Sequence, residues 1–242
     1  MSINNRYNGK VVLIAGGAGT VGSGIARAFL NEGASVAVPS RSEGSIQKLK
    51  SYTKGQEERL LIINEDISTL DGANKVRDAV LSRFGKIDHV VSTLGPWIQK
   101  GPISTVSVDD FREAIHDLCE SHFIAAKSFL PIVANQQGSS YTIITGAAGE
   151  ACYSADSGLT TLGAAALFGL SLALRSEHAN SPVRINEFRI SIRIDRDEDL
   201  KHPHQHSHLK LGEAITGVVH SDKKNQVIQC RSNEDLINFA KL

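Results

Sequence analysis

Short apolar runs alternate along this chain with longer segments in which apolar residues recur at helical spacing. A short apolar run between turn residues is typical of a buried strand, and a period of about 3.6 residues is typical of an amphipathic helix. The runs predict strands at Val11–Ala15, Ala34–Val38, Leu60–Asn64, His89–Ser92, Tyr141–Thr145, Arg184–Phe188 and Gln226–Gln229. The periodic segments predict helices at Val21–Glu32, Ser45–Thr53, Leu70–Phe84, Val108–Asn135, Gly158–Ala179 and Leu209–His220. The alternation predicts an α/β doubly wound parallel sheet, a Rossmann fold, as one domain over residues 1–242.

The connection between the first predicted strand and the first predicted helix is rich in glycine. Glycines there allow positive φ and let a phosphate approach the backbone, while the helix start offers free N–H groups. The order of strand, turn and helix favours a dinucleotide-phosphate site over a purely structural tight turn. The residues of this predicted site are Gly16, Gly17, Gly19, Thr20, Val21 and Gly22.

The residues after the second predicted strand bear on which cofactor binds. A free ribose 2′-hydroxyl usually meets an acidic residue about 20 positions after the glycines. Here Ser40, Arg41 and Ser42 occupy that place. The planar guanidinium of Arg41 suits a 2′-phosphate, so the sequence favours NADP(H) over NAD(H). The alternative is a solvated loop arginine.

Two further strand ends carry predicted cofactor contacts. Asp66 and Ile67 follow the third strand, where a carboxylate can accept from the adenine amino group. Alternatively, Asp66, Ser68 or Thr69 caps the next helix. After the fourth strand come four small or apolar residues that let a cofactor lie over the sheet edge: Ser92, Thr93, Leu94 and Gly95.

These four sites, in this order, resemble the short-chain dehydrogenase/reductase family over about residues 8 to 190. Gly16 and Gly22 match the ends of the family's Thr-Gly-x-x-x-Gly-x-Gly turn, and Asp66-Ile67 is similar to its adenine-contacting pair. Only Gly95 is kept from the family's Asn-Asn-Ala-Gly. The resemblance implies a nicotinamide dinucleotide, a small-molecule substrate and oxidoreductase activity.

The family's catalytic residues are missing from the second half of the chain. The family uses a tyrosine, a lysine one helical turn later, a serine and an assisting asparagine. Thr160, Ala164, Gly146 and Leu118 stand at those positions. No lysine occurs between Lys127 and Lys201, so no alternative pair lies on this helix.

The remaining hydroxyl groups near this region are weak candidates for the missing chemistry: Thr145, Tyr153 and Thr160. Three hypotheses follow. The first is an NADP(H)-dependent oxidoreductase with non-standard acid–base groups, and the second is a catalytically silent cofactor-binding sensor or partner subunit. The third is a structural oligomer that has lost the cofactor.

Composition excludes several other classes. Lys+Arg and Asp+Glu are both 26, so no basic field for nucleic acid is expected. The three cysteines are widely spaced, which argues against a disulfide framework and a zinc module. The polar start of the chain lacks a signal-peptide core, and no uninterrupted apolar run is long enough to span a membrane. A cytoplasmic protein is therefore expected.

Two late segments raise questions of assembly and metal binding. The helix predicted from Gly158 is apolar on all faces, and family members commonly pair it and Val108–Asn135 across two-fold axes. A homodimer or homotetramer is therefore expected, against a monomer with one buried helix. In an extended chain, alternate residues share a face, so four imidazoles could converge on a metal. A polar substrate loop is favoured over a metal site for the four histidines, which are His202, His204, His206 and His208.

Overall fold

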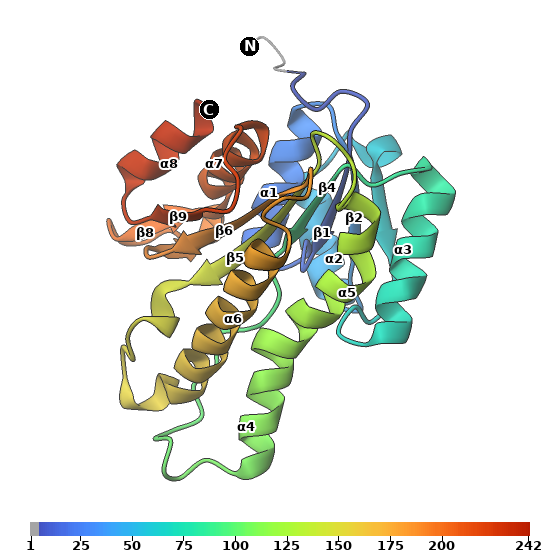
Figure 1. Ribbon diagram of the computed structural model, residues 1–242. Coiled ribbons are helices and arrows are strands. Elements are labelled where there is room, and N and C mark those ends of the chain that lie inside the picture. The colour runs from blue at the N-terminus through green and yellow to red at the C-terminus, as the bar shows by residue number, and fades with distance from the viewer. Residues whose placement is uncertain (1–4) are drawn as a thin grey trace.

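The computed structural model describes residues 5–242, and a seven-stranded parallel sheet forms its centre (Figure 1). The strand order is β3-β2-β1-β4-β5-β6-β9. These strands are β1 (Val11–Ala15), β2 (Ser35–Pro39), β3 (Leu60–Ile63), β4 (His89–Ser92), β5 (Ser140–Gly146), β6 (Arg184–Ile190) and β9 (Val227–Cys230). A separate two-stranded ladder pairs β7 (Arg193–Asp195) with β8 (Gln205–Ser207).

The helices connect successive strands and cover both faces of the sheet. They are α1 (Thr20–Asn31), α2 (Glu43–Tyr52), α3 (Leu70–Phe84), α4 (Val108–Ile115), α5 (Ser121–Val133), α6 (Gly158–Glu177), α7 (His208–His220) and α8 (Asn233–Ala240). The chain runs outward from β1 to β2 and β3, then returns to place β4 on the other side of β1. The strand order therefore reverses between β1 and β4, where ligands bind in open α/β sheets.

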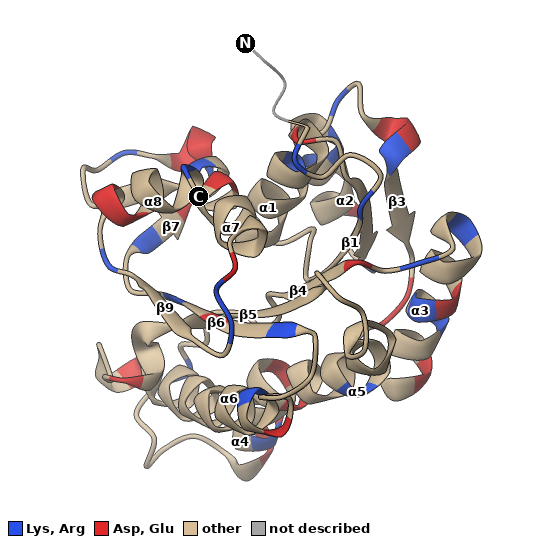
Figure 2. Ribbon diagram, turned by 45° about the horizontal axis from the view of Figure 1, so that its top comes forward, with Lys and Arg blue, Asp and Glu red and all other residues tan. Residues whose placement is uncertain are grey.

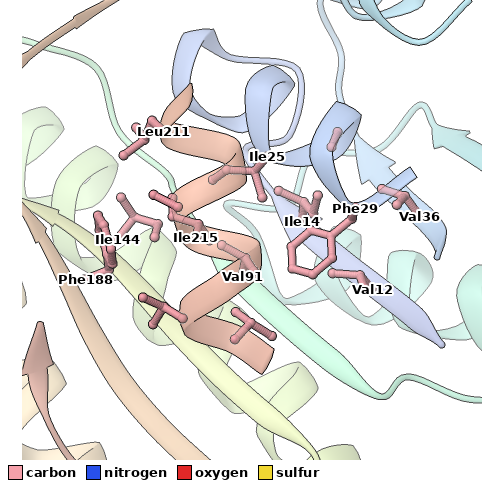
Figure 3. Close-up of a cluster of buried hydrophobic side chains, with 14 of the residues drawn as sticks. Val12, Ile14, Ile25, Phe29, Val36, Val91, Ile144, Phe188, Leu211 and Ile215 are labelled. Atoms are coloured by element: carbon pink, nitrogen blue, oxygen red, sulfur yellow. The ribbon is translucent and has the colours of Figure 1, made fainter. Parts of the chain in front are cut away.

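Two apolar layers hold this arrangement together. On one face, α1 and α7 pack over the sheet, and Ile25, Phe29 and Leu211 are fully buried there (Figure 3). The other face is covered by α3, α5 and α6, with Phe129 and Leu167 in its core. Figure 2 shows α1, α7 and α8 above the sheet and α3 to α6 below it. The α/β doubly wound fold is confirmed.

Element boundaries follow local capping. Ser42 accepts a hydrogen bond from Ser45 N at 3.3 Å, so α2 begins two residues before its predicted start. The single helix predicted at Val108–Asn135 was wrong in detail, because a π-helical turn at His116–Glu120 separates α4 from α5. Such a turn inserts one extra residue per turn, which apolar periodicity does not reveal.

Helix α8 and the short strands β7 and β8 were missed. Ser232 caps α8, and Glu234 and Asp235 stand in its first turn, a signal that the sequence contained. Strands β7 and β8 span three residues each, too short for a visible alternation.

Helix α6 has an ambiguous composition. The helical stretch Ala155–Glu177 is long and apolar enough to cross a membrane by length and composition alone, and 39% of its most apolar window is buried. It packs against β5 and β6, with Leu159 and Leu167 turned inward. Its composition is therefore also that of a core helix with one face left uncovered.

Candidate functional site

The glycine turn closes tightly over the end of β1. Gly16 has a φ of 83°, and a Cβ there would lie 2.1 Å from the carbonyl oxygen of Thr93. A Cβ on Gly22 would lie 2.2 Å from the carbonyl oxygen of Gly16. Gly19 is the exposed N-cap of α1, and it leaves the first N–H groups of that helix without a side-chain cap. These are the features that a pyrophosphate site at a helix start requires.

A cleft of about 380 Å³ opens between this turn and the ends of β2, β3 and β4. Nine of the predicted cofactor residues line it: Gly16, Gly19, Ser40, Arg41, Asp66, Ile67, Thr93, Leu94 and Gly95. The other six residues of that prediction do not line the cleft: Gly17, Thr20, Val21, Gly22, Ser42 and Ser92. The structure also adds lining residues that the sequence did not single out, among them Ser45, Glu65, Asp117 and Ser121.

Arg41 and Asp66 form an ion pair at the rim of the cleft. Arg41 Nη1 lies 2.6 Å from Asp66 Oδ2, and the two side chains are 67% and 29% exposed. Burial alone raises the pKa of Asp66, but hydrogen bonds from Ser68 and the charge of Arg41 outweigh it and hold the pKa below its ordinary value. Asp66 is therefore a carboxylate, able to accept hydrogen bonds.

The alternative role of this segment, capping the next helix, belongs to Thr69. Its hydroxyl accepts from Gly72 N at 3.1 Å, at the start of α3. Asp66 instead accepts from the backbone N–H and hydroxyl of Ser68 at 3.0 and 2.7 Å. Its second carboxylate oxygen faces Arg41, at the cleft rim.

Ser92 does not reach the cleft, because its side chain is fully buried against α5. Its hydroxyl lies 2.7 Å from His122 Nδ1, and His122 Nε2 lies 3.1 Å from the carbonyl oxygen of Leu94. A carbonyl oxygen only accepts, so Nε2 carries the proton and Nδ1 accepts from Ser92. Burial lowers the pKa of His122 to about 4, which keeps the ring neutral. This bridge fixes the β4 end beside the cleft.

An apolar cluster surrounds Leu118, which aligns with the assisting asparagine of the family. Leu118 is 8% exposed and lies in the π-helical turn, packed with Ile98, Ala114 and Leu159. A Cβ on Gly163 of α6 would lie 2.5 Å from Leu118 Cδ1. The absence of a side chain at Gly163 is what allows Leu118 to enter.

Thr160 is tied to the loop after β4. Its hydroxyl donates to the carbonyl oxygen of Ile98 and accepts from Ile98 N, both at 2.8 Å. Thr160 is 5% exposed and does not line the cleft. Both hydrogen-bonding directions of the hydroxyl are therefore used in holding the loop to α6.

Thr145 belongs to a buried charged network under α6. Its hydroxyl donates to Glu187 Oε1 at 2.9 Å, and Glu187 has no exposed surface. Arg189 Nη2 lies 2.6 Å from the same Glu187 oxygen, and Arg189 also pairs with Glu150. The Arg189 guanidinium stacks 3.6 Å from the Phe168 ring centre. Glu187 in a buried strand inside the sheet was the sequence signal for this network.

Tyr153 and the histidine segment lie apart from the cleft. Tyr153 is 63% exposed in the loop before α6. His202 and His204 stack on each other at 5.4 Å, whereas His208 is buried against Tyr52. Within residues 5–242, no three His, Cys, Asp or Glu side chains are grouped to hold a metal ion.

The segment that leads to α7 is fastened to α2. Tyr52 OH donates to Glu198, and Arg196 Nη1 donates to Tyr52 OH at 3.3 Å. His208 Nδ1 accepts from Asp197 N at 3.1 Å. These contacts hold residues 196–208 against the face of the sheet that α1 and α7 cover.

Comparison with known proteins identifies the family to which the chain belongs. The family model for short chain dehydrogenases matches residues 10–192. The chain is 28% identical over 191 residues to L-fucose dehydrogenase of Oryctolagus cuniculus, covering 77% of this chain and 63% of that protein. It is 29% identical over 138 residues to cis-2,3-dihydrobiphenyl-2,3-diol dehydrogenase of Pseudomonas sp. (strain KKS102), covering 55% of this chain and 49% of that protein. The aligned stretches thus span less than two thirds of either relative.

Solved structures share the fold at low sequence identity. A short-chain dehydrogenase/reductase from Serratia marcescens BCRC 10948 superposes with a TM-score of 0.82 at 16% identity, covering 93% of this chain and 97% of that one. A short-chain dehydrogenase from Burkholderia cenocepacia J2315 in complex with NADP gives 0.80 at 19% identity, with the same coverage of both chains. With the family model matching most of its length, the chain belongs to the short-chain dehydrogenases, a family of NAD(P)-dependent oxidoreductases.

Proposed function

We propose that this chain binds NADP(H) in the cleft between the glycine turn and the ends of β2, β3 and β4. The glycine turn is the observation that carries the proposal, because two of its positions admit no side chain and the helix start above it is uncapped. These N–H groups would hold the pyrophosphate, and Asp66 with Ile67 would contact the adenine. Arg41 on the rim supports a 2′-phosphate, aided by the start of α2.

We propose further that the bound cofactor does not serve the family's carbonyl reduction. A bound NADPH supplies a hydride, but carbonyl reduction also needs a proton donor beside the acceptor. Leu118 packs against Gly163 where that machinery belongs, and both hydrogen bonds of Thr160 are made to Ile98. This supports a cofactor-holding sensor or partner subunit.

A second candidate is an oxidoreductase with non-standard acid–base groups. The observation in its favour is that the cleft continues beyond Gly95 to Asp117 and Ser121. The substrate would then lie beside these residues and be one whose acceptor needs little protonation. The relatives named above are dehydrogenases, which agrees with this candidate.

One pair of measurements separates these candidates. Titration of NADPH and NADH by calorimetry should give a micromolar Kd for NADPH, about 8 kcal/mol, with weaker binding of NADH. NADPH at saturation is then incubated with aldehydes, ketones, enones and quinones, and oxidation is followed by absorbance. No oxidation above buffer supports the holding role, whereas turnover of about 1 per second establishes the oxidoreductase. No binding of either nucleotide refutes both.

We also propose that two copies of this chain associate through the outer faces of α4, α5 and α6. These adjacent helices expose large apolar side chains: Phe111, Phe123, Leu162 and Leu172 are each more than 40% exposed (Figure 1). A self-complementary apolar face of this kind suits a two-fold interface. Light scattering should give a dimer or tetramer, and Phe123→Glu should shift it to smaller species; a monomeric wild type would refute the interface.

A further inference from the structure

A second and larger cavity lies at the amino ends of the strands, opposite the proposed cofactor cleft at their carboxyl ends. Its volume is about 730 Å³, against about 380 Å³ for the cleft. It opens where strands begin: Lys10 precedes β1, His89 starts β4 and Arg184 starts β6. A cavity of this size is in the range of small-molecule sites. Nothing in the proposed cofactor chemistry uses it.

Two cations in this cavity have only carbonyl partners. Arg184 is half-buried and donates to the carbonyl oxygens of Val219 at 3.0 Å, Gly138 at 3.2 Å and Ser221. Lys224 Nζ donates to the carbonyl oxygen of Ser181 at 2.6 Å. Among residues 5–242, neither cation forms an ion pair with a carboxylate. Their hydrogen bonds are satisfied, and Asp222 offsets the charge of Arg184 only from beyond ion-pair distance.

The remaining charges do not remove this excess. Arg6 is neutralised by Glu32, with contacts of 2.6 and 2.5 Å, and Lys10 shares Asp88 with Lys86. Asp222 is the one carboxylate among the lining residues of this cavity, and it makes no ion pair in the described part of the chain. The lining residues of this cavity, counted with their ion-pair partners, therefore include more cations than carboxylates.

Two buried aromatic side chains, Tyr7 and His89, are among the lining residues of this cavity. Burial lowers the pKa of His89 to about 3, so its ring is neutral, and it lies 2.9 Å from Ser140 Oγ. The Tyr7 hydroxyl donates to the carbonyl oxygen of Thr216 at 2.6 Å, and its ring meets His89 edge to face. A ligand here would meet an aromatic base and a cationic rim.

We propose that this cavity binds a small multivalent anion carrying phosphoryl or carboxylate groups. Arg184 and Lys224 would supply the counter-charge, since charge-assisted hydrogen bonds to such groups are the strong ones. The proposal is independent of the cofactor cleft, because the two sites lie at opposite ends of the strands.

The test uses inorganic pyrophosphate and citrate as probes of the two anion types. Each is titrated calorimetrically at low ionic strength into the full chain presaturated with NADP⁺, which blocks pyrophosphate from the cleft. Lys224→Ala should weaken binding about tenfold, and Lys224→Glu should weaken it further. Lys54→Ala, a change at an exposed lysine outside the cavity, should leave it unchanged. Whichever probe binds more tightly identifies the anion type.

Amide shifts in a heteronuclear spectrum locate the probe independently of these variants. Shifts at Gly138, Ser181 and Val219 support the proposal. It is overturned if neither probe binds, if Lys224→Glu binds both as the wild type does, or if the shifts fall at Gly16 to Gly22. If Lys224→Glu fails to fold, Lys224→Ala serves in its place, and wild-type binding of both probes by that variant overturns the proposal.

Discussion

The two halves of the candidate site lie side by side at the carboxyl ends of the strands but are built in opposite ways. Around β1 to β4, glycines keep the backbone bare and polar groups line an open cleft. Around β5 and α6, aliphatic side chains and two hydrogen bonds to Ile98 close the corresponding space. The proposed cofactor binding and the family's proton transfer therefore depend on different elements of this fold.

Substitution at Gly22 should break the cofactor half most severely. The Cβ of Gly22→Ala would lie 2.2 Å from the carbonyl oxygen of Gly16, so the turn must open. NADPH affinity should fall about 100-fold, roughly 3 kcal/mol, by calorimetry. Gly44→Ala is the matched control, because its Cβ meets nothing within 4 Å. Equal affinities in the two variants would contradict the assignment of the phosphate site.

Substitution at Leu118 should break the apolar half without touching the glycine turn. Leu118→Ala should lower the free energy of unfolding by about 2–5 kcal/mol in urea, because it leaves a cavity between α6 and the π-helical turn. Leu70→Ala, at a residue 43% exposed, should change it by less than about 0.5 kcal/mol. A loss under about 1 kcal/mol at Leu118 would show that this cluster is loosely packed.

Acid should act on the cofactor half through His122. Its pKa is lowered to about 4 in the folded state and is about 6.5 when unfolded, so the unfolded chain binds the extra proton first. His122 should therefore contribute a fall in stability of about 3 kcal/mol as pH drops from about 6.5 to 4, in addition to the contribution of buried His89, whose pKa is also lowered. His122→Gln should flatten that slope in urea unfolding, whereas His204→Gln, at an exposed residue, should not. Identical slopes in both variants would remove His122 as the cause.

The smallest expected effect concerns the choice of nucleotide. Arg41→Ala should weaken NADPH binding about tenfold and leave NADH within about twofold, because only NADPH carries the 2′-phosphate. Lys48→Ala on the exposed face of α2 serves as the control. If both nucleotides weaken equally, Arg41 supports the cleft rim rather than selecting the phosphate.

How much could be predicted from sequence differs between the two halves. The glycine turn was predictable because a strand, a turn and a helix are all local, and all seven sheet strands were predicted within two residues of their observed ends. The absence of the Tyr–Lys pair was also readable. What replaces it was not, because Leu118 meets Gly163 only through tertiary packing across a π-helical turn.

The direction of each side chain was the second feature that the sequence could not predict. Ser92 stands at the strand end that the fold assigns to ligands, yet its hydroxyl points to His122, not to the cleft. Thr145 likewise turns to Glu187, a residue some forty positions later in the chain. A strand end is predictable from sequence, whereas the partner that its side chain chooses depends on the neighbouring helices.

The ion pair between Arg41 and Asp66 would make the proposed binding of NADPH an exchange of partners. A 2′-phosphate must share or take over a guanidinium that already holds a carboxylate at 2.6 Å. Because both side chains are partly exposed, giving up that pair costs no more than about 1 kcal/mol. Added salt screens the Arg41–Asp66 ion pair that is lost as well as the contact between Arg41 and the phosphate that is gained. The NADPH affinity of this chain should therefore fall less steeply with ionic strength than it would if Arg41 had no carboxylate partner in the free protein.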